Sequence, residues 1–154
     1  MSKKNGFTLV ELMVVIVIIG VLAAVAIPKM MAATNKAKAS EGPQILSAIA
    51  NMQAAHKAEQ DTFVVGMPAT PTGNAATGAP ADPSTWGKLG FDQNPSSRYF
   101  AFTVPGVSAS AFTATATLGV NLGKALSGDN LTINEFDIRV VSSQPLRELV
   151  PNWR

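Results

Sequence analysis

The sequence has no cysteine, a single histidine and few charged residues. Without cysteine there are no disulfides, thiolate metal sites or cysteine nucleophiles. Charged residues make up 14% of the 154 residues and hydrophobic residues 47%, whereas about a quarter of an ordinary soluble domain is charged. Part of the apolar content therefore serves something other than a globular core, and the hydrophobic residues should be unevenly distributed.

The low net charge and the absence of known catalytic motifs argue against several classes of function. A net charge of +2 without a basic run gives no sign of a direct nucleic-acid role. The sequence has no phosphate-binding glycine loop, nucleophile elbow or histidine pair for a metal. His56 falls on a predicted helix near Glu59, where an exposed or helix-end position is far commoner than catalysis. We therefore expect no enzyme activity, no catalytic residues, no cofactor and no metal.

The acidic residues Asp129, Glu135 and Asp137 lie close enough in the sequence to suggest a calcium loop. Calcium prefers several carboxylate and carbonyl oxygens gathered in one loop. Residues 130–132, however, have the pattern of a strand entry, which would separate these carboxylates. The same three residues match an N-glycosylation sequon, for which chance is the simplest explanation.

The uneven distribution appears near the amino terminus. Eighteen of the 21 residues in 7–27 are hydrophobic, and the exceptions are Thr8, Glu11 and Gly20. As a helix this run would be about 32 Å long, close to the roughly 30 Å hydrocarbon core of a bilayer. It has no polar stripe of the kind a soluble helix needs, so we expect a transmembrane helix over residues 7–28.

The segment before this run is short, polar and basic, with Lys3 and Lys4, as in the first region of a signal peptide. An ordinary secretory signal has small residues after its apolar region. Here the small residue, Gly6, precedes it. Cleavage after Gly6 would remove residues 1–6 as a leader and keep the apolar helix.

The residues from Gly6 to Glu11, Gly-Phe-Thr-Leu-Val-Glu, are followed by an apolar stretch to Pro28. Over about residues 1–38 this pattern resembles the prepilin signal of type IV pilins and type II secretion pseudopilins. The resemblance implies cleavage between Gly6 and Phe7 by a prepilin peptidase and N-methylation of Phe7. It also implies assembly into a helical filament of identical subunits, with Thr8, Leu9 and Glu11 in the assembly segment.

A carboxylate at Glu11 needs a partner within an apolar helix, because burying it costs about 2.5–3.5 kcal/mol on insertion scales. The amine of Phe7, freed by cleavage, could reach Glu11 of a neighbouring parallel helix and so fix the register of assembly. Alternatively, Glu11 lies about 6 Å inside the cytoplasmic boundary, reaches the headgroups and stabilises the start of its own helix. Both alternatives remain open from the sequence.

Charge alone does not orient the helix, because Lys3 and Lys4 precede it and further lysines follow it. The resemblance implies an inner-membrane protein that crosses the lipid bilayer once, with a cytoplasmic amino terminus. It also implies an inner-membrane assembly platform as partner. After assembly the subunit would belong to a surface pilus or a periplasmic pseudopilus.

Helix formers continue after the span, and we expect an amphipathic second half over residues 29–62. Pro28 should bend or loosen the helix. Gly42-Pro43 should give either a kink or a break, with Pro43 opening a new helix at its first position. Beyond it, apolar residues recur at helical spacing and should face a sheet; they are Ile45, Ile49 and Met52, flanked by Leu46, Ala48 and Ala55.

The rest of the chain predicts a loop and then a sheet. Residues 64–98 hold five of the ten prolines and five of the twelve glycines, which indicates a long surface loop over 63–98, fixed to the head by Trp86, Leu89 and Phe91. We expect strands at 99–104 and 112–118. In a third apolar run the alternation slips phase at Asn134-Glu135, from Leu131 and Ile133 to Phe136, Ile138 and Val140. A bulge or tight turn would explain the slip, and we expect the apolar face of these strands to meet the helix.

These elements predict an α+β pilin fold, in which the long helix packs on three or four antiparallel strands formed by residues 99–154 with their tail. The favoured function is a structural subunit of a pilus used in adhesion, twitching motility or DNA uptake. The alternative is a pseudopilin of a type II secretion system, and a more remote one is a membrane-anchored enzyme or sensor. The chain lacks both a cysteine pair and an obvious acidic calcium loop, so neither the pilin nor the pseudopilin pattern is complete.

Overall fold

The computed structural model describes residues 6–70, 86–91, 95, 97–105, 108, 110–119 and 128–153. It divides into two compact units, residues 1–34 and 35–154. The first unit is a helix, most of α1 (Leu9–Ala39). The second unit, which we call the head, contains the rest of the elements. The predicted α+β architecture, a long amino-terminal helix and an antiparallel sheet, is confirmed.

The helix continues through Pro28 and is interrupted once, at Ser40. The second helix, α2 (Glu41–Gln60), begins there. Pro43 has no N–H to donate to the carbonyl of Ala39, so the helical hydrogen-bond ladder is broken at that carbonyl. The interruption is thus confined to one missing hydrogen bond, and α2 begins two residues before Pro43 rather than with Pro43 at its first position. The backbone of Ser40 stays in the right-handed helical region, with φ −70° and ψ −14°.

The head contains a four-stranded antiparallel sheet in the order β1-β2-β3-β4. Its strands are β1 (Phe100–Thr103), β2 (Thr113–Leu118), β3 (Asn130–Asn134) and β4 (Arg139–Val141). In β2 the apolar residues are buried and the threonines are partly exposed in strict alternation, as the sequence predicts. The residues on the buried face include Ala114, Ala116 and Leu118.

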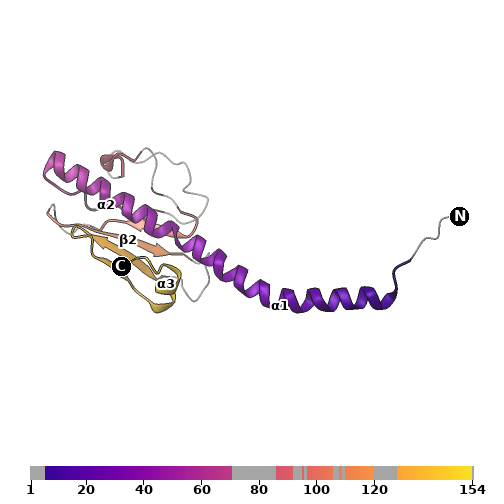
Figure 1. Ribbon diagram of the computed structural model, residues 1–154. Helices are drawn as coiled ribbons and strands as arrows, with labels where there is room; N and C mark the ends of the chain where they lie inside the picture. The colour runs from indigo at the N-terminus through magenta and orange to yellow at the C-terminus, as the bar shows by residue number, and fades with distance from the viewer. Residues whose placement is uncertain are drawn as a thin grey trace. The chain divides into compact units, whose positions relative to one another are not determined.

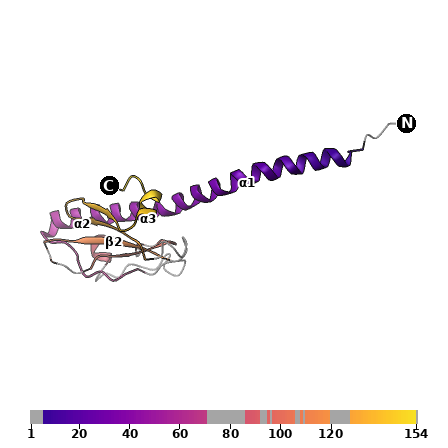
Figure 2. The same cartoon turned by 90° about the horizontal axis from the view of Figure 1, so that it is seen from below.

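The helix α2 runs across one face of this sheet, so the head consists of two layers (Figures 1 and 2). The face that α2 buries is Gly42, Leu46, Ile49 and Gln53. These positions recur at helical spacing, but they lie to one side of the predicted face. Ile45 and Met52 are only partly buried, and Ala55 is exposed.

The phase slip at Asn134 is a tight turn between β3 and β4. The side-chain oxygen of Asn134 accepts hydrogen bonds from the backbone N–H groups of Phe136, at 3.1 Å, and Ile138, at 2.9 Å. The expectation that the apolar residues after this turn join the buried face is wrong. Phe136, Ile138 and Val140 are 74%, 56% and 51% exposed, because the turn moves them off the side that faces α2.

The remaining described segments pack onto the head. Trp86 and Leu89, in the short 3₁₀ helix η2 (Trp86–Leu89), are buried, and Phe91 meets Trp86 edge to face at 6.0 Å. The predicted attachment of the loop is thus confirmed. A short carboxy-terminal helix, α3 (Gln144–Leu149), and the tail behind it bury Leu146, Val150 and Trp153. Much of the predicted 63–98 loop and of the 119–130 connection lies outside the described residues.

Candidate assembly site

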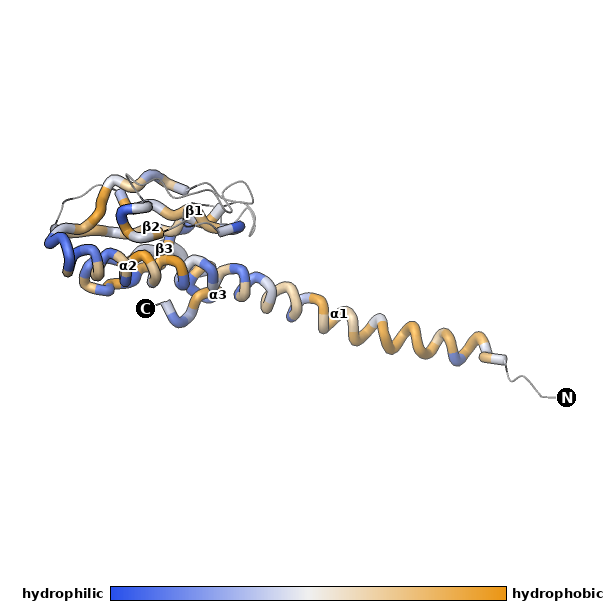
Figure 3. Tube along the Cα trace, turned by 90° about the horizontal axis from the view of Figure 1, so that it is seen from above, coloured by the Kyte–Doolittle hydropathy of each residue, from blue (hydrophilic) through white to orange (hydrophobic). Residues whose placement is uncertain are grey.

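The first unit presents apolar side chains to its surroundings on every side. From Phe7 to Met31 the large apolar side chains are between 47% and 86% exposed, and apolar colour dominates this part of α1 (Figure 3). By its length and composition the long helix could cross a membrane. A soluble monomer rarely exposes so large an apolar surface, so this helix has a surface that the subunit itself does not cover.

The predicted cleavage site lies just before α1. Phe7 is 86% exposed, and the position of a β-carbon on Gly6 would meet no atom within 4 Å. Among the described residues, therefore, no contact closes the Gly6 side of this junction or requires glycine there. Residues 1–5 of the leader lie outside the described residues. Cleavage between Gly6 and Phe7, and methylation of Phe7, stay predictions.

Thr8 and Glu11 form a reciprocal cap at the start of α1. The backbone N–H and the hydroxyl of Thr8 donate to Oε2 of Glu11, at 2.9 and 2.7 Å. In return, the N–H of Glu11 donates to the hydroxyl oxygen of Thr8, at 3.2 Å. This arrangement is a capping box, in which two residues satisfy the helix's first unpaired donors. Leu9, the first residue of the helix, is 76% exposed.

The cap gives the Glu11 carboxylate partners within its own chain. A negative charge at this end is also stabilised by the helix dipole. Of the two alternatives for Glu11, the contact with its own helix start is therefore present in the isolated subunit. All the donors in the cap belong to residues after Gly6, so cleavage there would leave it intact. Pairing with a neighbour's amine stays a prediction.

Gly42 has a role that sequence reasoning assigned differently. A β-carbon at Gly42 would lie 2.9 Å from Cζ of Phe100 and 3.0 Å from Cδ1 of Leu131. Such separations are shorter than van der Waals contact, so α2 approaches the sheet as closely as it does because this residue has no side chain. The prediction for Gly42 concerned a backbone kink and did not include this close packing against the sheet. The only sequence signal was a glycine in line with Leu46 and Ile49.

Two polar contacts that the sequence did not reveal fix α2 to the segments behind it. Gln53 is fully buried; its amide nitrogen donates to the carbonyl of Val64 at 2.6 Å, and its oxygen accepts from the Val64 N–H at 3.0 Å. The hydroxyl of Ser97 donates to Glu41 at 2.5 Å. These bonds join residues far apart in sequence, which periodicity cannot indicate.

Two of the three acidic residues of the suggested calcium loop, Asp129 and Asp137, have other partners. Asp137 forms an ion pair with Arg139 at 3.0 Å, and Asp129 accepts a hydrogen bond from Ser143. Within the described part of the chain, no three acidic, histidine or cysteine side chains gather in a way that could hold a metal ion. His56 lies 2.8 Å from the carbonyl oxygen of Thr62 through Nδ1, at the end of α2.

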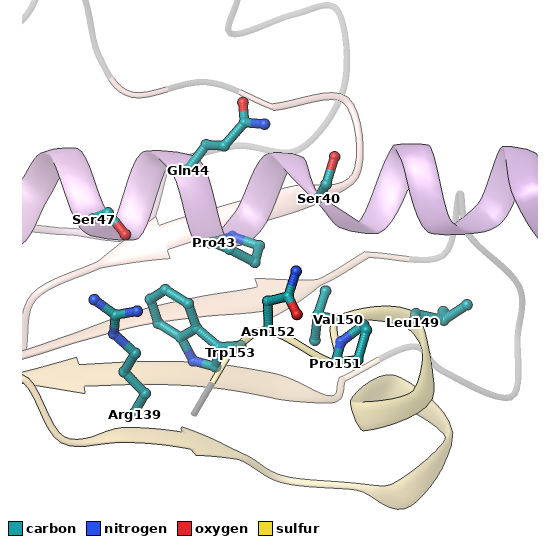
Figure 4. A pocket seen from close by; sticks show the side chains of 10 residues that line it. All are labelled: Ser40, Pro43, Gln44, Ser47, Arg139, Leu149, Val150, Pro151, Asn152 and Trp153. Carbon is teal, nitrogen blue, oxygen red and sulfur yellow. The ribbon is translucent and has the colours of Figure 1, made fainter.

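A cleft of about 430 Å³ lies between α2 and the carboxy-terminal tail (Figure 4). Pro43 and Ser47 belong to its helical side, while Trp153 and Asn152 come from the tail. Its one ionisable side chain is Arg139, which lies 4.9 Å from the Trp153 ring and is paired with Asp137. The lining residues therefore contain no acid and base pair for catalysis, and the contacts of Arg139 connect the tail to the sheet.

Comparison with known proteins agrees with the geometry at the amino terminus. Residues 1–27 match the family model for the prokaryotic N-terminal methylation motif. The chain is 35% identical over 94 residues to type II secretion system core protein G of Pseudomonas aeruginosa, covering 58% of this chain and 63% of that protein. It is 41% identical over 61 residues to the type IV major pilin protein PilA of Myxococcus xanthus, covering 40% and 28%. The matches thus span less than two thirds of these two relatives.

A fimbrial protein of Moraxella nonliquefaciens is 30% identical over 116 residues, covering 70% of this chain and 72% of that protein. This match extends beyond the amino-terminal motif into the head. The motif, the exposed apolar helix and the α+β head occur together here. The chain therefore belongs to the family of type IV pilins and type II secretion pseudopilins.

Proposed function

We propose that this chain is a structural subunit of a type IV pilus-like filament, used in adhesion, twitching motility or DNA uptake. The observation that carries the proposal is the apolar surface of residues 7–31, which the subunit leaves exposed and most of which lies within the methylation motif at residues 1–27. Helices of this kind satisfy all their backbone groups internally and can lie in lipid or against one another. The same surface can therefore serve first in the membrane and then in the filament.

In this proposal, residues 1–6 are a leader that a prepilin peptidase removes in the inner membrane, and Phe7 is then N-methylated. Before assembly the mature subunit crosses the bilayer once, with its amino terminus on the cytoplasmic side. The loss of Lys3 and Lys4 leaves ten basic and ten acidic side chains. The assembly platform of the inner membrane would then transfer subunits from lipid to the filament.

Glu11 would set the register between neighbouring subunits. Its carboxylate is already held by Thr8 at the start of α1, and it is the one charged side chain between Phe7 and Pro28. An incoming subunit gains an ion pair when its Phe7 amine lies beside this carboxylate, and in an apolar surrounding such a pair is strongly dependent on position. Thr8 and Leu9 would lie at the same contact.

A second candidate is a pseudopilin that builds a periplasmic filament for type II secretion. The observation in its favour is the 94-residue match to the secretion protein of Pseudomonas aeruginosa. The match to the fimbrial protein covers more of the chain, 116 residues, and we therefore place the pilus first. The neighbouring genes would discriminate, because a retraction ATPase belongs with a pilus and a secretin operon with secretion.

The processing step can be tested by expressing the chain together with a prepilin peptidase and measuring the mass of its amino-terminal peptide. We expect a mature terminus at an N-methylated Phe7. Gly6→Val should leave the leader attached, because the residue before the cleaved bond then carries a branched side chain in place of a hydrogen atom. Gly20→Ala is the matched control, because a β-carbon there also meets no atom within 4 Å. Processing of Gly6→Val at the normal rate would contradict the proposal.

A further inference from the structure

The head carries a small apolar surface of its own. Among the described residues after Met31, the exposed large apolar side chains are Phe136, Ile138 and Val140. They alternate along the turn and strand that close the β3–β4 hairpin. We call these three residues the hairpin row. Exposed apolar residues scattered singly need no explanation, but three gathered in one short segment do.

The register of the sheet shows which side Val140 occupies. Val140 pairs with Thr132, while Arg139 and Val141 pair with Ile133 and Leu131. Leu131, Ile133 and Val141 are buried on the α2 side. Since side chains alternate across a strand, Val140 lies on the opposite side of the sheet from α2. Packing among the described residues of the head therefore gives no reason for an apolar residue there.

The turn that presents the hairpin row is held by a set of local bonds. Asn134 accepts from the N–H groups of Phe136 and Ile138 through its side chain, and its carbonyl accepts from Asp137 at 3.0 Å. Asp137, at a φ of 57°, is paired with Arg139. A surface held in one conformation loses little entropy when it binds. The row is therefore preorganised for a contact.

We propose that the hairpin row is a contact between the heads of neighbouring copies of this chain in the filament, which rests on the proposed function above. The row exposes on the order of 300 Å², whereas each partner in a stable complex buries roughly 800 Å². It is too small to hold a free partner in solution. It can act between copies that the assembly helices already hold together, because tethering raises the effective concentration to the millimolar range.

The absence of cysteine allows a direct test by thiol labelling of the full-length chain. Ile138→Cys places one thiol in the row, and Gln60→Cys places one at the exposed end of α2, outside it. Each variant is treated with a maleimide as a detergent-solubilised subunit and as a filament. We expect Ile138→Cys to react more slowly in the filament by roughly tenfold, because a thiol must be accessible to react. Gln60→Cys should react at similar rates in both.

Equal reactivity of Ile138→Cys in subunit and filament would overturn the inference and leave the proposed function standing. Failure of the unmodified chain to form filaments would contradict the proposed function and overturn the inference with it. A second pair of variants keeps the fold constant. Phe136→Ser should produce filaments that shear into shorter fragments, whereas Phe136→Leu should resemble the unmodified chain. Equal shear resistance of Phe136→Ser would also overturn the inference.

Discussion

The two regions of this chain use apolar residues in opposite ways. In residues 7–31 the large apolar side chains are at least 47% exposed, whereas the core residues of the head are at most 7% exposed. The first region is apolar all around its helix, and the second follows the periods of helix and strand. Hydrophobicity without periodicity indicates a surface that other molecules must cover, and hydrophobicity with periodicity indicates one that the chain covers itself.

Separating the two regions should have the largest effect. A fragment of residues 29–154 keeps the head and loses most of the exposed apolar surface. We expect it to be soluble without detergent, monomeric by analytical ultracentrifugation at micromolar concentration and cooperative in thermal unfolding. It should form no filaments. Self-association of this fragment to a stable oligomer would show that the head contains an assembly surface of its own as strong as the helix.

The close approach of α2 to the sheet should be the most sensitive point within the head. Gly42→Ala would place a β-carbon 2.9 Å from Phe100, and overpacking of this kind costs about 1–3 kcal/mol. We expect a corresponding fall in the free energy of unfolding, measured by urea denaturation. Phe100→Leu in the same chain should recover part of the loss, because it removes the atoms that clash. A Gly42→Ala head as stable as the unmodified one would contradict this packing.

Replacing the buried amide of Gln53 should lower the stability of the head somewhat less. Gln53→Leu would leave the N–H and carbonyl of Val64 without their partners, at a cost of about 1–3 kcal/mol, partly offset by the apolar side chain that replaces the amide. Gln44→Leu on the exposed side of α2 should change stability by less than about 0.5 kcal/mol. Equal stability of the two variants in urea would show that the Val64 bonds contribute nothing.

Removing the charge of Asp61 at the end of α2 should have the smallest effect on stability, and this effect depends on pH. The side-chain hydrogen bond from Lys57 and its positive charge lower the pKa of Asp61. A carboxylate whose pKa is lowered by folding stabilises the fold above its ordinary pKa of about 3.9. This contribution is lost as the pH falls through the lower value in the folded state. Asp61→Asn should therefore reduce the loss of stability between pH 5 and 3, as measured by thermal unfolding.

Much of both regions could be predicted from the sequence, for physical reasons that particular residues illustrate. The alternation of alanine and threonine in β2 predicts directly which side chains are buried. For the run from Phe7 to Ile27, length and composition alone are enough to predict an apolar helix. Gly42 and Gln53 could not be foreseen, because their roles depend on Phe100, Leu131 and Val64, which the fold brings near. Local patterns carry no information about such distant partners.

The hairpin row shows a second kind of limit. Phe136, Ile138 and Val140 have the pattern of a buried strand, and the turn at Asn134 reverses their side. A sequence pattern that fails to be buried marks a place where local chemistry serves something other than the core. The same is true on a larger scale of the exposed helix. In both places the chain leaves apolar side chains exposed, and both are therefore proposed as surfaces for contact with other molecules.

The exposed helix is proposed to assemble copies of this chain in a register set by the charge of Glu11. The filament yield of Glu11→Val and Glu11→Gln, counted by electron microscopy in a host with the assembly machinery, tests this register. Both variants should insert and be processed, and both should lose filaments on the order of tenfold or more, because neither can pair with the Phe7 amine. Filaments at the unmodified yield from Glu11→Val would show that Glu11 does not set the register.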